Sequence, residues 1–405
     1  MKTETEKLWN LGFIELIAIS FLSSLSFSCI HPLVSSYAVS YGAELTAAGT
    51  AVGIYSISAM CVRPFGGYFT DKLNKKNLLF VSTLLLGLSF FAYVFCRSIS
   101  LLIALRIVHG IAFGINSTVN FALATKYIPK NRMGEGLGYY GVGQVIAQII
   151  GPTIGVAVKD TFGYTILFFA CAILVFGSAV LFFVFFQYEE PAKYAKMSED
   201  NAKSQSISGI LKNLIAPECI FYALIAGLFS MSNGIVNSFL VLNGEAKGIA
   251  GITYFFSVNA IFLFILRMTI GKVLDKSKAI LVVSVSLITG AISMAMLGLA
   301  GTLPLILIAG AIKAVGHVGG QVSLQSACVK KVDESRVGVA SSTYYIGADI
   351  GNGLGPIWGG KVAELSGYSS SFYAMSGVFG VGCIIFIVYE LLHKNNVKLE
   401  EAKNV

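Results

Sequence analysis

Long apolar stretches, separated by short polar loops, run through almost the whole chain. Each is long enough for a helix that crosses the hydrocarbon core of a bilayer, which takes about 20 residues. None alternates between apolar and polar residues over a sustained run, so the pattern predicts transmembrane helices and disfavours a β-barrel. The twelve predicted spans are Leu11–Tyr41, Thr46–Phe69, Asn77–Phe95, Leu101–Tyr127, Leu137–Val158, Tyr164–Gln187, Glu218–Asn243, Ala250–Gly271, Ala279–Ala300, Pro304–Val329, Gly338–Val362 and Ser370–Leu392.

The polar stretch Tyr188–Ala216 is the one long linker, and it leaves six predicted spans on either side. We therefore expect residues 1–187 to form an N-terminal six-helix bundle, residues 188–216 a linker and residues 217–405 a C-terminal six-helix bundle.

The two halves share residues at a constant spacing of 204 positions. This spacing relates Arg63 to Arg267, Gly67 to Gly271, Asp71 to Asp275, Tyr140 to Tyr344, Gly143 to Gly347, Gly151-Pro152 to Gly355-Pro356, Gly155 to Gly359 and Gly163-Tyr164 to Gly367-Tyr368. Matches at one spacing indicate a duplicated ancestral half. The fold class predicted is an all-α membrane protein made of two pseudo-symmetric six-helix bundles, and parallel halves are typical of transporters.

Composition agrees with a chain that lipid surrounds. Hydrophobic residues make up 55% and charged residues 12%, whereas a soluble protein carries about 25% charged residues. With both termini and every even-numbered loop on one side, that side holds 21 of the 29 lysines and arginines. The opposite side holds 4, and 4 lie in or at the ends of spans. The positive-inside rule then predicts cytoplasmic termini and a cytoplasmic linker, and the positive net charge indicates topology rather than nucleic-acid binding.

The segment Gly67–Lys76 resembles the signature of the major facilitator superfamily, Gly-x-x-x-Asp-Arg/Lys-x-Gly-Arg/Lys-Arg/Lys. Asn74 stands in place of its second glycine, a mild departure because asparagine also tolerates left-handed backbone angles. Asp71 is expected near the start of the third helix, one turn before Lys75. The resemblance implies the twelve-helix fold of this family and a latch that holds one gate shut; loop solubility and topology are the alternative. The latch candidates are Gly67, Asp71, Lys72, Lys75, Gly271 and Asp275.

The fifth predicted span resembles the antiporter motif of drug:proton antiporters within that family, Gly-x-x-x-Gly-Pro-x-x-Gly, with Ala147 at its first small position. Small residues every four positions form a flat face on which two helices can pack closely. Packing alone explains the glycines, and export rather than import is what the resemblance implies. The residues of this motif and its repeat are Gly143, Gly151, Pro152, Gly155, Gly347, Gly351, Gly355 and Pro356.

Ionisable residues inside the spans are the candidates for proton coupling, because charges in a membrane are expensive and usually functional. Arg106 and His109 resemble the Arg-x-x-Gln-Gly motif of the family, whose arginine lies near the proton path in antiporters. Asp349 lies alone in an otherwise uncharged stretch, and such a carboxylate is suited to taking up and releasing a proton; a static pair with Lys313 or Arg106 is the alternative. Glu15 is a further candidate, unless it reaches the cytoplasmic surface.

Other polar and aromatic residues within the spans are candidates for lining a substrate cavity. They are His31, Lys313, His317, Tyr344, Tyr345 and Phe113, with Phe121, Tyr139 and Tyr140 as weaker candidates. The seven cysteines are scattered without a CxxC pair and are interpreted as small buried hydrophobes, so no metal site is predicted.

The chain has no phosphate-binding Walker pattern, which disfavours direct coupling to ATP. We expect a proton-coupled secondary transporter that exports a small organic molecule, a drug-like compound or metabolite, across the bacterial inner membrane by alternating access. An organic-anion exchanger or importer is the alternative, because Arg106 and Lys313 add positive charge. A membrane sensor or enzyme would need an output domain or a catalytic cluster, and neither is evident. Protons, substrate and lipid are the expected partners of a monomer without cofactor or enzymatic activity.

Overall fold

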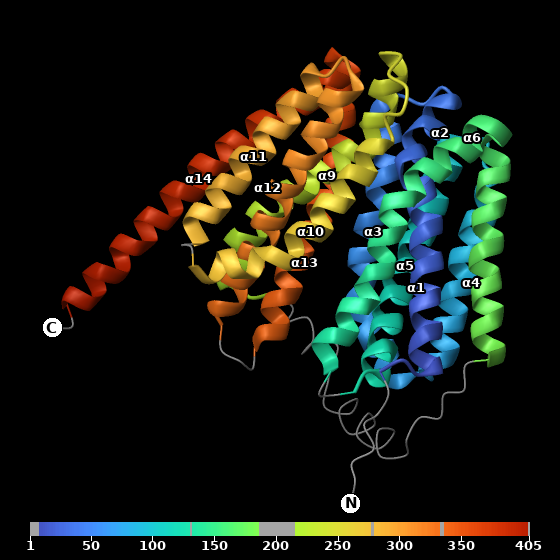
Figure 1. Ribbon diagram of the computed structural model, residues 1–405, viewed down its shortest axis with the longest axis horizontal. Coiled ribbons are helices and arrows are strands. Elements are labelled where there is room, and N and C mark those ends of the chain that lie inside the picture. Colours follow the sequence, from blue (N-terminus) through green and yellow to red (C-terminus); the bar gives the residue numbers. More distant parts are fainter. Residues whose placement is uncertain (1–7, 130–131, 186–214, 277–278, 333–335, 404–405) are drawn as a thin grey trace, which may run out of the picture. The chain divides into compact units, whose positions relative to one another are not determined.

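The computed structural model describes residues 8–129, 132–185, 215–276, 279–332 and 336–403 (Figure 1). Within these ranges, the side chains at positions 64, 66–72, 133–134, 185, 271–276, 279, 337–338 and 393–403 lie outside the description. The chain divides into two compact units, Met1–Lys212 and Asn213–Val405. This boundary falls inside the segment 188–216 that the sequence assigns to the linker.

The first unit is built from helices that follow the predicted spans closely. They are α1 (Leu11–Ile30), η1 (His31–Leu33), α2 (Val34–Ser40), α3 (Leu45–Lys72), α4 (Lys75–Tyr93), α5 (Ile99–Tyr127) and α6 (Met133–Phe185). The side chain of Asn10 caps α1 by accepting a hydrogen bond of 2.9 Å from the backbone N–H of Phe13. The short turn η1 contains Pro32 and connects α1 to α2, so the three elements together form the first span.

The second unit repeats this order. It contains η3 (Pro217–Cys219), α9 (Ile220–Ala246), α10 (Tyr254–Lys276), α11 (Ala279–Leu299), α12 (Leu303–Lys330), α13 (Val337–Ser366) and α14 (Tyr368–Lys403). Each predicted span of this half overlaps one of these helices. The described residues of both units contain helices, turns and loops, and no strand.

In both units, a glycine with a positive φ angle separates two consecutive spans. Gly163 interrupts α6 with a φ of 83°, so that this long helix consists of two segments joined at a kink. Gly367, its equivalent in the repeat, has a φ of 86° and ends α13 directly before α14. Left-handed backbone angles favour glycine, which explains why both copies of the duplication have it at this position.

Nine described helices, with the kinked α6 taken as one, are long and apolar enough to cross a membrane. Tyr254–Ile270 of α10 forms a shorter apolar helix. The all-α membrane fold predicted from the sequence is therefore confirmed, while the number of twelve spans is compatible with these helices and stays a prediction.

The connection between α3 and α4 differs from the expectation at Asp71. Asp71 lies in the last turn of α3 and not at the start of the next helix. Asn74 has φ −60° and ψ 116°, an extended conformation, and its side chain accepts a hydrogen bond of 3.1 Å from the backbone N–H of Asn77. Asn74 is thus a helix N-cap, and its capping side chain explains why asparagine suits this position without left-handed angles.

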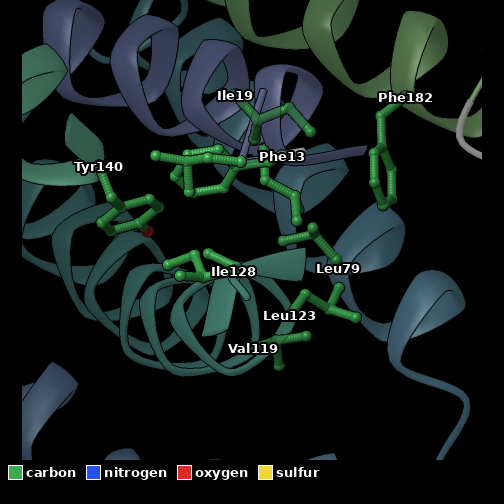
Figure 2. Close-up of a cluster of buried hydrophobic side chains, with 11 residues drawn as sticks. Phe13, Ile19, Leu79, Val119, Leu123, Ile128, Tyr140 and Phe182 are labelled. Carbon is green, nitrogen blue, oxygen red and sulfur yellow. The ribbon is translucent and has the colours of Figure 1, made fainter. Parts of the chain in front are cut away.

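A cluster of buried apolar side chains joins four helices of the first unit (Figure 2). It contains Leu8, Phe13, Leu16, Ile19, Leu79, Val119, Leu123, Ala124, Ile128, Tyr140 and Phe182, which come from α1, α4, α5, α6 and adjoining loops. Inside a membrane, such a cluster stabilises the bundle through close van der Waals packing, since lipid tails are as apolar as the side chains. Tyr140, a weak candidate for the substrate cavity, lies in this core, and helix packing explains its aromatic ring.

Candidate functional site

The guanidinium of Arg106 is completely buried between α5 and α3. Its Nε donates a hydrogen bond of 2.9 Å to the backbone oxygen of Ala51, and one terminal nitrogen lies 3.4 Å from the oxygen of Val52. The guanidinium carbon lies 4.4 Å from the centre of the Tyr55 ring, a cation–π contact. Among the described residues it has no ion pair, so carbonyl dipoles and an aromatic face compensate the charge.

Aromatic rings surround this cation. Phe27 of α1 stacks on Tyr55 at a centroid distance of 5.0 Å and on Phe113 at 5.9 Å. On its other side Phe27 stacks on His31 at 4.5 Å. Two of the predicted cavity residues, His31 and Phe113, are therefore brought together by Phe27, which the sequence analysis did not single out.

His109 lies one turn after Arg106 and belongs to the same group. Its Nδ1 lies 2.8 Å from the hydroxyl of Tyr93 on α4, and its ring contacts Phe90 at a centroid distance of 4.6 Å. His109 also contacts the ring of Tyr55 on α3 at a centroid distance of 5.1 Å, so the motif pair predicted from the sequence lies where α5 meets both α3 and α4.

A second buried polar group lies in the other unit. The Nζ of Lys313 on α12 donates a hydrogen bond to Oδ1 of Asn233 on α9. The Nδ2 of Asn233 lies 3.3 Å from Nε2 of His317, one turn further along α12. Lys313 is 4% exposed and His317 is 8% exposed, so both predicted cavity residues are buried against α9. Asn233, which joins them, was missed by the sequence analysis.

Asp349 occupies the middle of α13 and is half-buried. Its neighbours Gly347 and Gly351 contact α9, because a Cβ on them would lie 2.3 Å from the oxygen of Ala223 and 2.1 Å from that of Gly227. Successive residues turn by about 100° around a helix, so Asp349 projects from the opposite face of α13. The static pair of Asp349 with Lys313 or Arg106 stays, like its role in coupling, a prediction.

The remaining ionisable and tyrosine candidates lie in different surroundings. Glu15 is half-buried near the start of α1 and interacts electrostatically with Lys76 in the first turn of α4. Tyr344 is buried and donates a hydrogen bond of 3.1 Å to the backbone oxygen of Gln321. Tyr345 is 50% exposed. Glu15 is therefore separate from the Arg106 group, and Tyr344 binds α13 to α12.

The latch candidates fall largely outside the described side chains. This is true of Gly67, Asp71, Lys72, Gly271 and Asp275. Lys75, at the first position of α4, is described and is buried. The latch stays a prediction. In the part of the chain that is described, no group of three or more His, Cys, Asp and Glu side chains is placed to hold a metal ion.

The motif glycines lie where helices approach most closely. In α6, a Cβ on Gly151 would lie 2.6 Å from Cβ of Ser28, and one on Gly155 would lie 2.0 Å from the backbone oxygen of Cys29. Gly143, at 3.4 Å from Phe21, is in ordinary contact. Pro152 is buried. These residues allow α1 to lie directly against α6.

The repeat in α13 is packed in the same way against α9. A Cβ on Gly355 would lie 2.4 Å from the backbone oxygen of Met231, and Pro356 lies within 2.6 Å of a Cβ built on Gly234. With Gly347 and Gly351, these contacts form one continuous face of α13 in which backbone touches backbone. Such a face needs glycine because any side chain would separate the helices.

Duplicated membrane helices that bury charged groups define a multi-pass membrane transporter. The model of the Major Facilitator Superfamily matches residues 16–356 and, in a second match, residues 223–404. The chain belongs to the major facilitator superfamily, as its motifs indicated.

Relatives align over nearly the whole chain. An uncharacterized MFS-type transporter of Bacillus subtilis, YuxJ, is 25% identical and is aligned over 92% of this chain and 97% of its own length. Multidrug resistance protein MdtG of Proteus mirabilis is 26% identical, with 88% and 90% covered. Multi-drug resistance efflux pump PmrA of Streptococcus pneumoniae is 24% identical, with 91% and 93% covered.

Solved structures share the fold at lower identity. The nucleoside transporter NupG is 16% identical with a TM-score of 0.74, and the match covers 94% of this chain and 99% of that one. A POT family transporter in complex with a thioalcohol-conjugated peptide is 14% identical with a TM-score of 0.76, covering 94% and 96%. At this identity the likeness extends to the fold and not to the substrate.

Proposed function

We propose that this protein exports a small organic molecule across the bacterial inner membrane in exchange for protons, by alternating access. The observation that carries the proposal is the near full-length similarity to proteins named as multidrug resistance and efflux proteins in Proteus mirabilis and Streptococcus pneumoniae. The close α1–α6 packing at Gly151 and Gly155 supports it, since the motif that these glycines belong to resembles that of drug:proton antiporters.

Asp349 is the proposed carrier of the coupling proton. Its carboxylate projects from the face of α13 opposite the glycine face that packs on α9, so hydration around it can change without separating these two helices. A carboxylate in a dry environment favours its neutral form, and water or a nearby cation favours the ionised form. Arg106 is fully buried and acts as a positioning residue through its hydrogen bonds to α3.

Both termini and the linker are placed in the cytoplasm under this proposal. Its basis is the asymmetric distribution of lysine and arginine between alternate loops. A single cysteine introduced into the linker should react with an impermeant maleimide in everted vesicles and stay unmodified in intact cells. Labelling in intact cells would reverse the orientation.

A second candidate function is that of an organic-anion exchanger or importer. It is favoured because the two buried cations are stabilised by neutral hydrogen-bond acceptors. Arg106 is hydrogen-bonded to backbone carbonyls and Lys313 to a neutral amide, and within the described residues neither forms an ion pair. Unpaired cations in a membrane protein commonly serve charged substrates or ions.

Everted membrane vesicles distinguish these candidates. Respiration acidifies the vesicle interior, which quenches an acidity-sensitive dye, and an antiporter substrate added outside should restore fluorescence as protons leave. Compounds from a library of drug-like molecules and metabolites should do so in vesicles with the wild-type protein and not with Asp349→Asn. Asp160→Asn, the same change at an exposed carboxylate 2.8 Å from Lys159, is the matched control and should behave as wild type. A library that gives proton signals in none of the vesicles, with substrate exchange unaffected by the gradient, would favour the anion exchanger.

A further inference from the structure

The buried polar group around Lys313 can be compared with its equivalent in the first half, because the two halves are copies of one ancestral sequence. The spacing of 204 positions relates Lys313 to His109 and His317 to Phe113. It also relates Arg106 to Gly310 and Ala51 to Phe255. In the first half Arg106 binds the backbone oxygen of Ala51. In the second half a Cβ on Gly310 would lie 3.3 Å from the backbone oxygen of Phe255. The equivalence of α5 and α12 is therefore spatial as well as sequential.

The third member of each group comes from the first helix of its half, Phe27 from α1 and Asn233 from α9. The spacing of 204 positions relates Asn233 to Cys29 and Phe27 to Met231, so the two residues lie two positions apart in register and are not equivalent.

The two equivalent positions on α5 and α12 thus meet the first helix of their half with different chemistry. In the first half, Phe27 stacks on Phe113 and its ring lies 6.4 Å from that of His109. In the second half, Asn233 contacts both His317 and Lys313. A mostly aromatic contact is thus replaced by three hydrogen-bonding side chains. Because the aromatic version already packs this position in the same fold, helix packing does not require the polar version.

Hydrogen-bond donors exceed acceptors within this group. Lysine contributes three N–H donors and no acceptor, asparagine two donors and one acceptor oxygen, and neutral histidine one donor and one acceptor nitrogen. The contacts from Lys313 to Asn233 and from Asn233 to His317 use both acceptors. Among the described residues, Lys313 has no other hydrogen-bond partner and no carboxylate. The group therefore has unused hydrogen-bond donors beside a buried cation. These suit an anionic ligand whose atoms only accept hydrogen bonds.

We propose that Lys313, Asn233 and His317 form a recognition site for the carboxylate of an organic anion. The ammonium of Lys313 supplies the charge, while Asn233 holds it in place and His317 offers a further N–H. That this carboxylate belongs to the transported molecule rests on the proposed transport function; the binding itself does not.

Paired ligands that differ in one group test the site. Purified protein in detergent is titrated with a panel of aryl and alkyl carboxylates and with the corresponding primary amides, and binding is measured by thermal shift and by calorimetry. We expect several carboxylates to bind the wild type at least about tenfold more tightly than their amides, as a charge-assisted hydrogen bond gives. Lys313→Gln should remove this preference and Lys313→Arg should retain part of it. Lys361→Gln, an exposed lysine that pairs with Glu364 at 3.1 Å, should leave it unchanged.

Asn233→Asp adds an independent reading. An aspartate here places a carboxylate against the ammonium inside the protein, so the variant should fold stably and yet lose the preference for carboxylate ligands. The proposal is overturned if wild type binds carboxylates and amides equally throughout the panel, or if Lys313→Gln keeps the preference. Carboxylate binding that depends on Lys313 without any proton-driven transport would overturn the proposed function alone.

Discussion

Replacing Gly351 with alanine tests how far the helix packing depends on the glycine face of α13. A Cβ at this position would lie 2.1 Å from the backbone oxygen of Gly227, where ordinary contacts begin near 3.4 Å. The obstructing atom belongs to the backbone of α9, so it cannot rotate away. The two helices must separate by about 1 Å, and overpacking of this kind costs about 1–3 kcal/mol.

The cost should appear as a lower melting temperature. For a unit of about 200 residues, 1 kcal/mol corresponds to about 2–4 °C, so Gly351→Ala should melt about 3–10 °C below the wild type. Gly377→Ala is the matched control, because a Cβ on this helical glycine of α14 meets nothing within 4 Å. Alanine there should leave stability unchanged or raise it by up to about 1 kcal/mol.

Melting of the purified protein in detergent, followed by the fluorescence of a thiol-independent dye or by light scattering, provides the comparison. Equal melting temperatures for Gly351→Ala and Gly377→Ala would refute the reasoning, since the glycine face would then have no part in setting the distance between α9 and α13.

Three further outcomes are expected. Asn116→Ala should lower the free energy of unfolding by about 1–2 kcal/mol, because the buried amide donates hydrogen bonds to Thr83 at 2.8 Å and to Ser82; a melting curve like that of the wild type would contradict this. Arg106→Ala should destabilise by about 3 kcal/mol because it leaves a cavity and removes the hydrogen bonds to α3, and Arg106→Lys should recover only part because an ammonium cannot form the planar hydrogen bonds of guanidinium; full recovery in thermal melts would show that charge alone suffices. Asp349→Asn should abolish uphill transport and preserve substrate exchange, measured with radiolabelled substrate; uphill transport with the pH dependence of the wild type would make Asp349 structural.

The sequence predicted the helices well because each span has its own signal. Long apolar runs, a polar linker and the constant spacing of the duplication identify spans without reference to tertiary contacts. The duplication even marked Gly163 and Gly367, whose positive φ angles separate consecutive spans in both units. The error at Asp71 has a local cause: α3 runs one turn further than the apolar residues, and the polar turn then leads to the N-cap Asn74.

The partners of the polar residues could not be predicted in the same way. When most faces of a helix are apolar, periodicity does not indicate which face meets which neighbour. Tyr93 beside His109 and Asn233 beside Lys313 are therefore known only from the structure. One signal was available: strict use of the 204-residue spacing aligns Lys313 with His109, and this would have directed attention to the first helix of each half.

A driven-transport measurement tests the exchange of substrate for protons most directly. Proteoliposomes with an acidic interior receive, outside, a compound that gave a proton signal in everted vesicles. In the wild type the compound should accumulate inside above its external concentration while the interior loses protons, and with Asp349→Asn it should only equilibrate. Accumulation that instead requires an alkaline interior would mean that substrate and proton move together, and accumulation that ignores the gradient would mean that protons are not coupled; either result would contradict the account.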